Sequence, residues 1–213
     1  MTEVKIHRFT LEPWDQNCYV ASVSGGEAVV IDPGDDVEEI VGHLSDHGLR
    51  LHAVLATHGH HDHVGAAGEL LARYGVPLAI HSGDSKVLER INLSRYAFDR
   101  KPPIAVPPIG IDLADREGLQ FGKLNIGVLH TPGHSPGSVC FLIDGQLFTG
   151  DTLLADGRGR SDLPGGDAAA LHESVGSLLR RFPPQTGLHP GHGEPGILET
   201  AGANFGVDGV PYR

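Results

Sequence analysis

Side chains that bind metal ions are concentrated in one short loop, His58-Gly59-His60-His61-Asp62-His63. Imidazoles stand at positions 58, 60 and 63, and a carboxylate stands at position 62. Because only 14 of the 213 residues are histidine, this spacing is improbable by chance. Neutral imidazole and carboxylate groups suit Zn²⁺ or a similar divalent ion. The loop therefore predicts a metal site; the alternative is a solvated turn in which Asp62 caps the next helix.

Further ligand-type side chains recur downstream, each at the end of an expected strand. They are His134, Asp151 and His192, and each has a glycine beside it. Glycine lets one backbone segment approach another closely. We therefore expect these three residues to meet the 58–63 loop at one rim of the fold.

The remaining histidines near these motifs are weaker candidates. We expect His61 to point away from the metal ions, either into solvent or toward a hydrogen-bond partner. His81, His130 and His189 end strands near the same rim, where they could hydrogen-bond to metal ligands.

The overall composition restricts the class of protein. A hydrophobic content of 39% supports a full core, and a net charge of −11 argues against a nucleic-acid partner. No apolar run approaches the ~20 residues of a membrane span. The first residues lack the apolar segment of a signal peptide. We therefore predict a cytoplasmic protein with no membrane partner, and we interpret Cys18 and Cys140, each in an apolar run, as buried thiols.

Hydrophobic periodicity divides the chain into two strand-rich halves. The first half should contain strands at 5–11, 18–23, 28–32, 51–56 and 77–80, with one helix from 37 that Gly48 ends and another at 64–74. The second half should contain strands at 123–130, 139–143, 146–148 and near 187–188, with a helix at about 168–182 capped by Asp167. Two such halves with helices outside predict an α+β fold, a four-layer αββα sandwich. We expect it to form a single domain over residues 1–213.

Residues 83–117 are the least regular segment. A short charged helix at 84–90 is expected, followed by several basic residues and two proline pairs. Both a lid beside the site and a flexible surface loop fit this composition.

The order and spacing of the motifs resemble those of the metallo-β-lactamase superfamily over nearly the whole chain. The matching segments are Asp32-Pro33-Gly34, the Thr57–His63 loop, Thr131-Pro132-Gly133-His134, Gly150-Asp151-Thr152 and Pro190-Gly191-His192-Gly193. The run from Gly150 to Asp167 looks most like short type II glyoxalases, the hydroxyacylglutathione hydrolases. The resemblance implies two divalent ions, Zn²⁺ first and iron or manganese as alternatives. It places His58, His60 and His134 on one ion, Asp62, His63 and His192 on the other, and Asp151 between them.

This resemblance implies a hydrolase in which a metal-bridging hydroxide, oriented by Asp62, attacks the carbonyl carbon of a small thioester or ester. A thiolate with a pKa of ~8.5 leaves without a general acid, which favours a thioester. The positively charged centre favours an anionic substrate, and Arg160 is a candidate carboxylate contact, the alternative being an ion pair with Asp162. Only 21 residues follow His192, so we expect no separate C-terminal helical domain for glutathione. An iron-dependent persulfide dioxygenase and a lactonase remain alternatives on the same fold.

Overall fold

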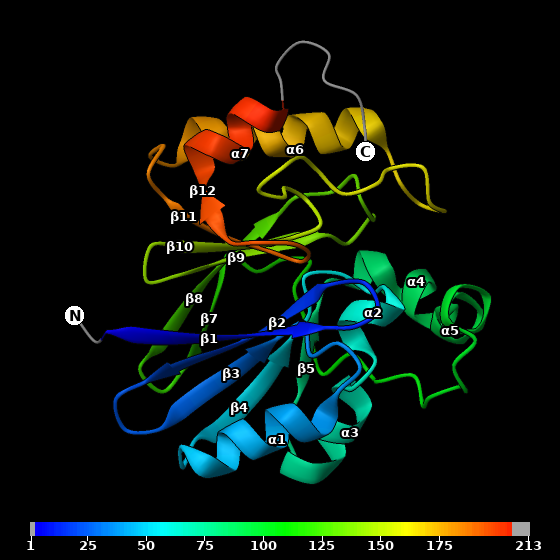
Figure 1. The fold of residues 1–213 in the computed structure, drawn as a ribbon, viewed down its shortest axis with the longest axis vertical. Helices are drawn as coiled ribbons and strands as arrows, with labels where there is room; N and C mark the ends of the chain where they lie inside the picture. Colours follow the sequence, from blue (N-terminus) through cyan, green and yellow to red (C-terminus); the bar gives the residue numbers. More distant parts are fainter. Residues whose placement is uncertain (1–2, 206–213) are drawn as a thin grey trace.

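Two six-stranded sheets pack face to face in the computed structural model, which describes residues 3–205 (Figure 1). The first sheet has the order β1-β2-β3-β4-β5-β6. Its first three strands are antiparallel, and β3 to β6 run parallel. Its strands are β1 (Val4–Leu11), β2 (Gln16–Val23), β3 (Glu27–Ile31), β4 (Arg50–Leu55), β5 (Leu78–Ile80) and β6 (Ile111–Asp112).

The second sheet comes from the other half of the chain and has the order β12-β11-β10-β9-β8-β7. Its pairs are antiparallel except β10 with β11, which run parallel. Its strands are β7 (Gly118–Phe121), β8 (Leu124–His130), β9 (Val139–Ile143), β10 (Gln146–Gly150), β11 (Gly187–Pro190) and β12 (Gly196–Ile197).

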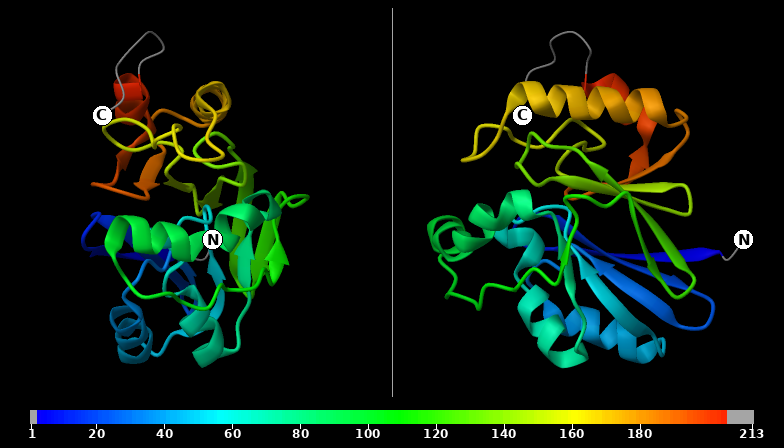
Figure 2. Two further views of the ribbon diagram at one scale, coloured as in Figure 1. Left: turned by 90° about the vertical axis from the view of Figure 1, so that its right-hand side faces the viewer. Right: turned by 180° about the vertical axis from the view of Figure 1, so that it is seen from behind.

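Helices cover the outer face of each sheet, which confirms the four-layer αββα prediction (Figures 1 and 2). On the first sheet lie α1 (Val37–Asp46) and α3 (Ala67–Tyr74), and on the second lie α6 (Ala168–Arg181) and α7 (Leu198–Phe205). The α2 helix (His61–Val64), the 3₁₀ helix η1 (Ser82–Asp84), α4 (Ser85–Glu89) and α5 (Ile91–Asp99) lie beside the layers.

Three apolar clusters fill the spaces between the four layers. Alternate residues of β3 point to opposite faces: Val30 packs with Ile40 of α1, whereas Ile31 packs with Phe141 of the second sheet. A third cluster joins the second sheet to α6 and α7. Cys18 belongs to the first cluster and Cys140 to the third; both are free and buried, as the sequence predicts.

Two helical segments differ from the sequence-based expectation. The helix expected at 64–74 begins only at Ala67, because the Ala66 amide donates to the Gly34 carbonyl and so separates α3 from α2. The helix α5 lies in the segment expected to be irregular. Its buried positions are Ile91 and Arg95, so an arginine stands where hydrophobic periodicity requires an apolar residue.

The terminal helix α7 and the short strands β6, β7 and β12 were also not expected from the sequence. Most other elements match their predicted ranges within about two residues, and Asp167 caps α6 through its bonds to two backbone amides. Within residues 3–205, no helix is long and apolar enough to cross a membrane. The single-domain prediction over 1–213 includes residues outside those described.

Candidate metal centre

The ligand loop follows β4 and turns directly into α2. The backbone amide of Thr57 donates to Asp32 Oδ1 at 2.7 Å, and the Gly59 amide donates to Asp84 Oδ2 at 2.8 Å. The His60 carbonyl accepts from the amides of His63 and Val64, which starts the helix. The bend between Thr57 and α2 therefore brings the side chains of residues 58, 60, 62 and 63 close together.

The other three candidate residues follow strands of the second sheet. His134 lies in the loop after β8, Asp151 directly follows β10, and His192 comes two residues after β11. Because β10 and β11 are parallel neighbours, Asp151 and His192 leave the sheet at the same edge. All seven residues predicted from the sequence thus lie together where the two sheets meet.

Six of the seven side chains form two groups of three. In the first, His134 Nε2 lies 3.2 Å from His58 Nε2 and 2.9 Å from His60 Nδ1. In the second, His192 Nε2 lies 3.2 Å from His63 Nε2 and 3.4 Å from Asp62 Oδ2. Each group could hold a metal ion.

Asp151 lies between the two groups. Its Oδ2 atom is 3.5 Å from His134 Nε2, whereas its Oδ1 atom is 3.5 Å from His63 Nε2 and 3.6 Å from His192 Nε2. Asp151 Oδ1 is buried and has no hydrogen-bond partner among the described residues. A Cβ at Gly191 would fall against this oxygen and the His63 ring, so glycine is required there.

For three of the five histidines, the bond of the outward-facing ring nitrogen fixes which nitrogen faces the cluster. His63 Nδ1 bonds to Asp32 Oδ2 at 3.0 Å, His134 Nδ1 to the Arg160 carbonyl at 2.7 Å, and His192 Nδ1 to the Trp14 carbonyl at 2.8 Å. Carboxylate and carbonyl oxygens only accept, so each of these three Nδ1 atoms carries a proton, and it is the Nε2 lone pair of the neutral ring that faces the cluster. These converging lone pairs, with the unpartnered Asp151 oxygen, fit a pair of divalent ions.

Burial and neighbouring charges lower the pKa values of two histidines in the first group and raise those of the two histidines in the second. Burial, reinforced by the other histidines, lowers the pKa of His58 well below its usual range and that of His60 to about 3. Burial also disfavours charge on His192, but Asp151 and Asp62 raise its pKa to about 10. His63 and His192 lower the pKa of Asp62 despite its burial, so this carboxylate is ionised at neutral pH.

Two buried carboxylates that the sequence analysis left without a role hold the loops. Asp32, in the Asp-Pro-Gly motif, bonds to Thr57 and His63. Asp84 accepts from the Gly59 and Gly137 amides and from Ser135 Oγ, which ties the 58–63 loop to the His134 loop. The Asp32 motif carried a signal in the sequence, whereas Asp84 lies in the irregular 83–117 segment and carried none.

His61 is buried, so the solvent-facing alternative considered for it is wrong. Its Nε2 atom lies 2.9 Å from Oδ2 of Asp99, the last residue of α5, so the ring faces that helix.

His81, His130 and His189, the three histidines expected near the rim, do not bond to a candidate ligand within the described part of the chain. His81 accepts from the Gly83 amide, His130 bonds to the Pro136 carbonyl and His189 bonds to Gln146.

Arg160 reaches the cluster through its backbone. Its carbonyl binds His134 Nδ1, whereas its guanidinium makes two bonds to Asp162, at 2.8 and 2.9 Å. Both of these side chains are exposed. An exposed ion pair of this kind is weak.

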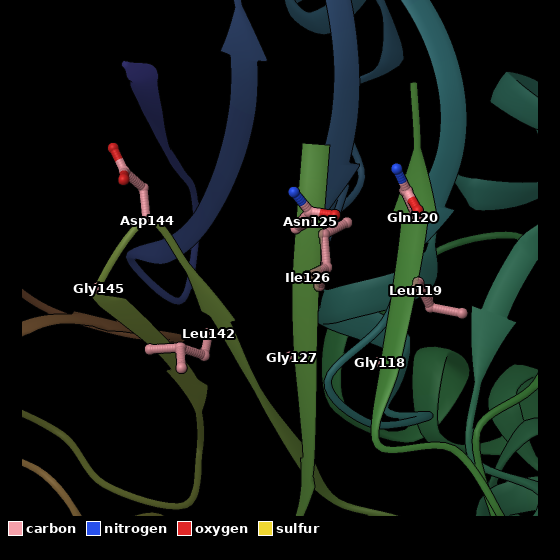
Figure 3. Close-up of a pocket in the computed structure, with 9 residues that line it drawn as sticks. All are labelled: Gly118, Leu119, Gln120, Asn125, Ile126, Gly127, Leu142, Asp144 and Gly145. Carbon is pink, nitrogen blue, oxygen red and sulfur yellow. The ribbon is translucent and has the colours of Figure 1, made fainter. Parts of the chain in front are cut away.

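A separate hollow lies over β7, β8 and β9 of the second sheet (Figure 3). Gln120, Asn125 and Asp144 are its polar side chains, and none of the seven candidate ligands lines it. This hollow is therefore distinct from the histidine–carboxylate cluster.

The fold and cluster together describe an αββα protein with a candidate two-metal centre at the meeting edge of its sheets. Residues 11–196 match the metallo-β-lactamase superfamily, and the chain belongs to that superfamily. The sequence is similar to the hydroxyacylglutathione hydrolase GloC of Haemophilus influenzae, with 33% identity over 84% of this chain and 86% of GloC.

Three solved structures are similar over most of their length. The BLEG-1 B3 metallo-β-lactamase is 31% identical, with a TM-score of 0.86 over 92% of this chain and 95% of its own. TTHA1623, in a di-iron-bound form, is 37% identical, with a TM-score of 0.82 over 93% and 98%. ETHE1 from Myxococcus xanthus is 25% identical, with a TM-score of 0.74 over 92% and 80%.

Proposed function

We propose that this protein is a dinuclear metallo-hydrolase that cleaves thioesters of the hydroxyacylglutathione type. The observation that carries the proposal is the position of Asp151, whose two oxygens face two different groups of histidines. A carboxylate so placed suits two ions at once. We assign His58, His60 and His134 to the first ion, Asp62, His63 and His192 to the second, and Asp151 to both.

Zn²⁺ is the ion that this imidazole-rich set suits first, and the di-iron form of TTHA1623 supports iron as an alternative. When bound, the ions would supply a water of lowered pKa and charge stabilisation for the developing oxyanion.

The protein's own side chains orient the reaction. Asp62 is ionised at neutral pH. Its Oδ2 atom lies 3.4 Å from His192 Nε2, whereas the nearest ion-pair partner of its Oδ1 atom among the described residues is His61 Nδ1, at 4.0 Å. This carboxylate can accept a hydrogen bond from the attacking water and hold it toward the carbonyl carbon. A thiolate leaving group with a pKa of ~8.5 requires no proton donor, and we assign no side chain to that role.

The likeness to GloC supports a glutathione thioester as the substrate, with Arg160 as a contact for its carboxylates. Hydrolysis of S-D-lactoylglutathione by the zinc-loaded protein tests this proposal. We expect free thiol to appear at the same rate with and without oxygen, and chelation to abolish it.

Parallel assays separate the alternatives. A β-lactam and a lactone panel serve as matched hydrolase substrates, and glutathione persulfide with an oxygen electrode tests for dioxygenase chemistry. Iron-dependent oxygen uptake without thioester cleavage would refute the hydrolase proposal. Hydrolysis of the lactam or lactone panel alone would refute the thioester assignment.

A further inference from the structure

Asp99, at the last residue of α5, is a buried carboxylate with two side-chain partners. Its side chain is only 4% exposed. Its Oδ2 atom lies 2.9 Å from His61 Nε2, and its Oδ1 atom accepts from the indole Nε1 of Trp14 at 2.8 Å. Both bonds are side chain to side chain, so they depend on the identity of these three residues.

Each partner leads to a ligand of the second group. His61 directly precedes Asp62, and His61 Nδ1 lies 4.0 Å from Asp62 Oδ1. Trp14 offers its backbone carbonyl to His192 Nδ1 at 2.8 Å. One carboxylate therefore binds both the residue that precedes Asp62 and the residue whose carbonyl binds His192, and these two candidate ligands come from opposite halves of the chain.

The first group is supported by different residues. His58 Nδ1 bonds to Thr57 Oγ1 and His134 Nδ1 to the Arg160 carbonyl. The loops that carry them are joined by Asp84. Across residues 3–205, none of these supports bonds to Asp99.

We propose that Asp99 is a positioning residue specific to the second metal group. It fixes the His61 ring behind Asp62 and the Trp14 carbonyl behind His192, so that their ligand atoms stay together without the ion. This role rests on the two-ion part of the proposed function and is independent of the thioester assignment.

The helix α5 does not depend on Asp99 for its own attachment. Arg95 and Lys101 both bind the Asp35 carboxylate, and the Asn92 side chain exchanges two bonds with the backbone of Ile104. Replacing the Asp99 carboxylate should therefore leave α5 in place and alter the second metal group alone.

Zn²⁺ titration of the metal-free protein tests this role directly. We expect the wild type to bind two ions. Asp99→Asn should weaken the second binding step 10–100-fold, as loss of a residue that orients a ligand does, and change the first less than twofold. His61→Phe, which lacks the donor to Asp99, should behave similarly. His61→Gln offers an amide donor and should recover part of the affinity.

Trp14 provides a readout that does not depend on activity, because it is the only tryptophan in the chain. Its emission in the wild type should change mainly with the second Zn²⁺ equivalent, and in Asp99→Asn this change should shift to higher Zn²⁺ concentration. Glu38→Gln, which alters an exposed carboxylate bound to Arg73, is the control and should match the wild type.

Equal weakening of both steps in Asp99→Asn would show a general structural role and overturn the proposal. Wild-type affinities in Asp99→Asn, or a wild type that binds a single ion, would also overturn it. The titration requires no thioester cleavage, so failure of the hydrolase assignment gives a separate result.

Discussion

Asp32→Asn is the substitution that tests most directly how the second metal group is oriented. Asp32 is buried and bonds to the Thr57 amide at 2.7 Å, to Thr57 Oγ1 at 2.7 Å and to His63 Nδ1 at 3.0 Å. Its φ of 49° lies in the left-handed region, which asparagine adopts as readily as aspartate. The substitution therefore alters the bonds without straining the backbone.

The magnitude follows from the number of acceptors that remain. The single oxygen of the introduced asparagine can keep the bond from the Thr57 amide, so its NH₂ group would face His63 Nδ1, which is itself a donor. The bond from His63 to a charged acceptor is lost, at about 1.5–3 kcal/mol, whereas the Thr57 hydroxyl can accept from the introduced NH₂ group and donate to His58 Nδ1 instead. His63 can restore a bond only by moving its proton to Nε2, which removes the lone pair from the metal-facing nitrogen. We therefore expect the affinity for the second Zn²⁺ ion to fall about 10–100-fold.

Calorimetric Zn²⁺ titration and thermal unfolding of the metal-free protein measure the two effects separately. Asp36→Asn is the matched control, because Asp36 only caps α1 and asparagine caps equally well. The reasoning would be refuted if Asp32→Asn kept wild-type affinity for both ions, since the tautomer of His63 would then not depend on Asp32.

Three further predictions concern activity and pH. Asp62→Asn should keep the fold but reduce kcat for thioester cleavage on the order of 10²-fold, measured by thiol release, because the negative charge and one of the two acceptor oxygens that can orient water are lost; an unchanged kcat would remove Asp62 from that role. Arg160→Ala should raise KM for carboxylate-bearing thioesters roughly tenfold while leaving neutral ones nearly unchanged, and equal effects would favour a purely structural pair with Asp162. Burial, with His7 and His47 nearby, lowers the pKa of His43 below its ordinary 6.5. The unfolded chain then takes up this proton first, so the protein loses stability as pH falls through 6.5, and His43→Gln should reduce the fall in Tm between pH 7 and pH 5.

The four layers and the proximity of the candidate ligands could be predicted from the sequence alone. Strict alternation and apolar runs marked most strands, and the seven ligand-type residues follow strands whose ends meet at one edge. Ligand chemistry restricts residue type strongly, so His58, Asp151 and His192 are recognisable without a structure. Their assignment to particular ions stays a prediction.

The supports of the site could not be predicted because they depend on contacts between distant segments. Asp84 and Asp99 are ordinary acidic residues in the sequence, and only the folded chain places them against Gly59 and His61. The helix that carries Asp99 was missed because Arg95, paired with Asp35, occupies its buried face.

The two halves of the chain are joined by protein bonds beside the ligands, which argues that the centre is largely formed before any ion binds. Tyr19 donates its hydroxyl to the Pro190 carbonyl at 2.7 Å, and Asn17 donates to the carbonyls of Pro190 and Gly193. These bonds run from the first sheet to both sides of His192. The Val139 amide likewise donates to the Thr57 carbonyl at 2.8 Å. Because the loops are already held together, ion binding has little backbone left to order, but it must displace the proton that Asp151 and Asp62 favour on His192.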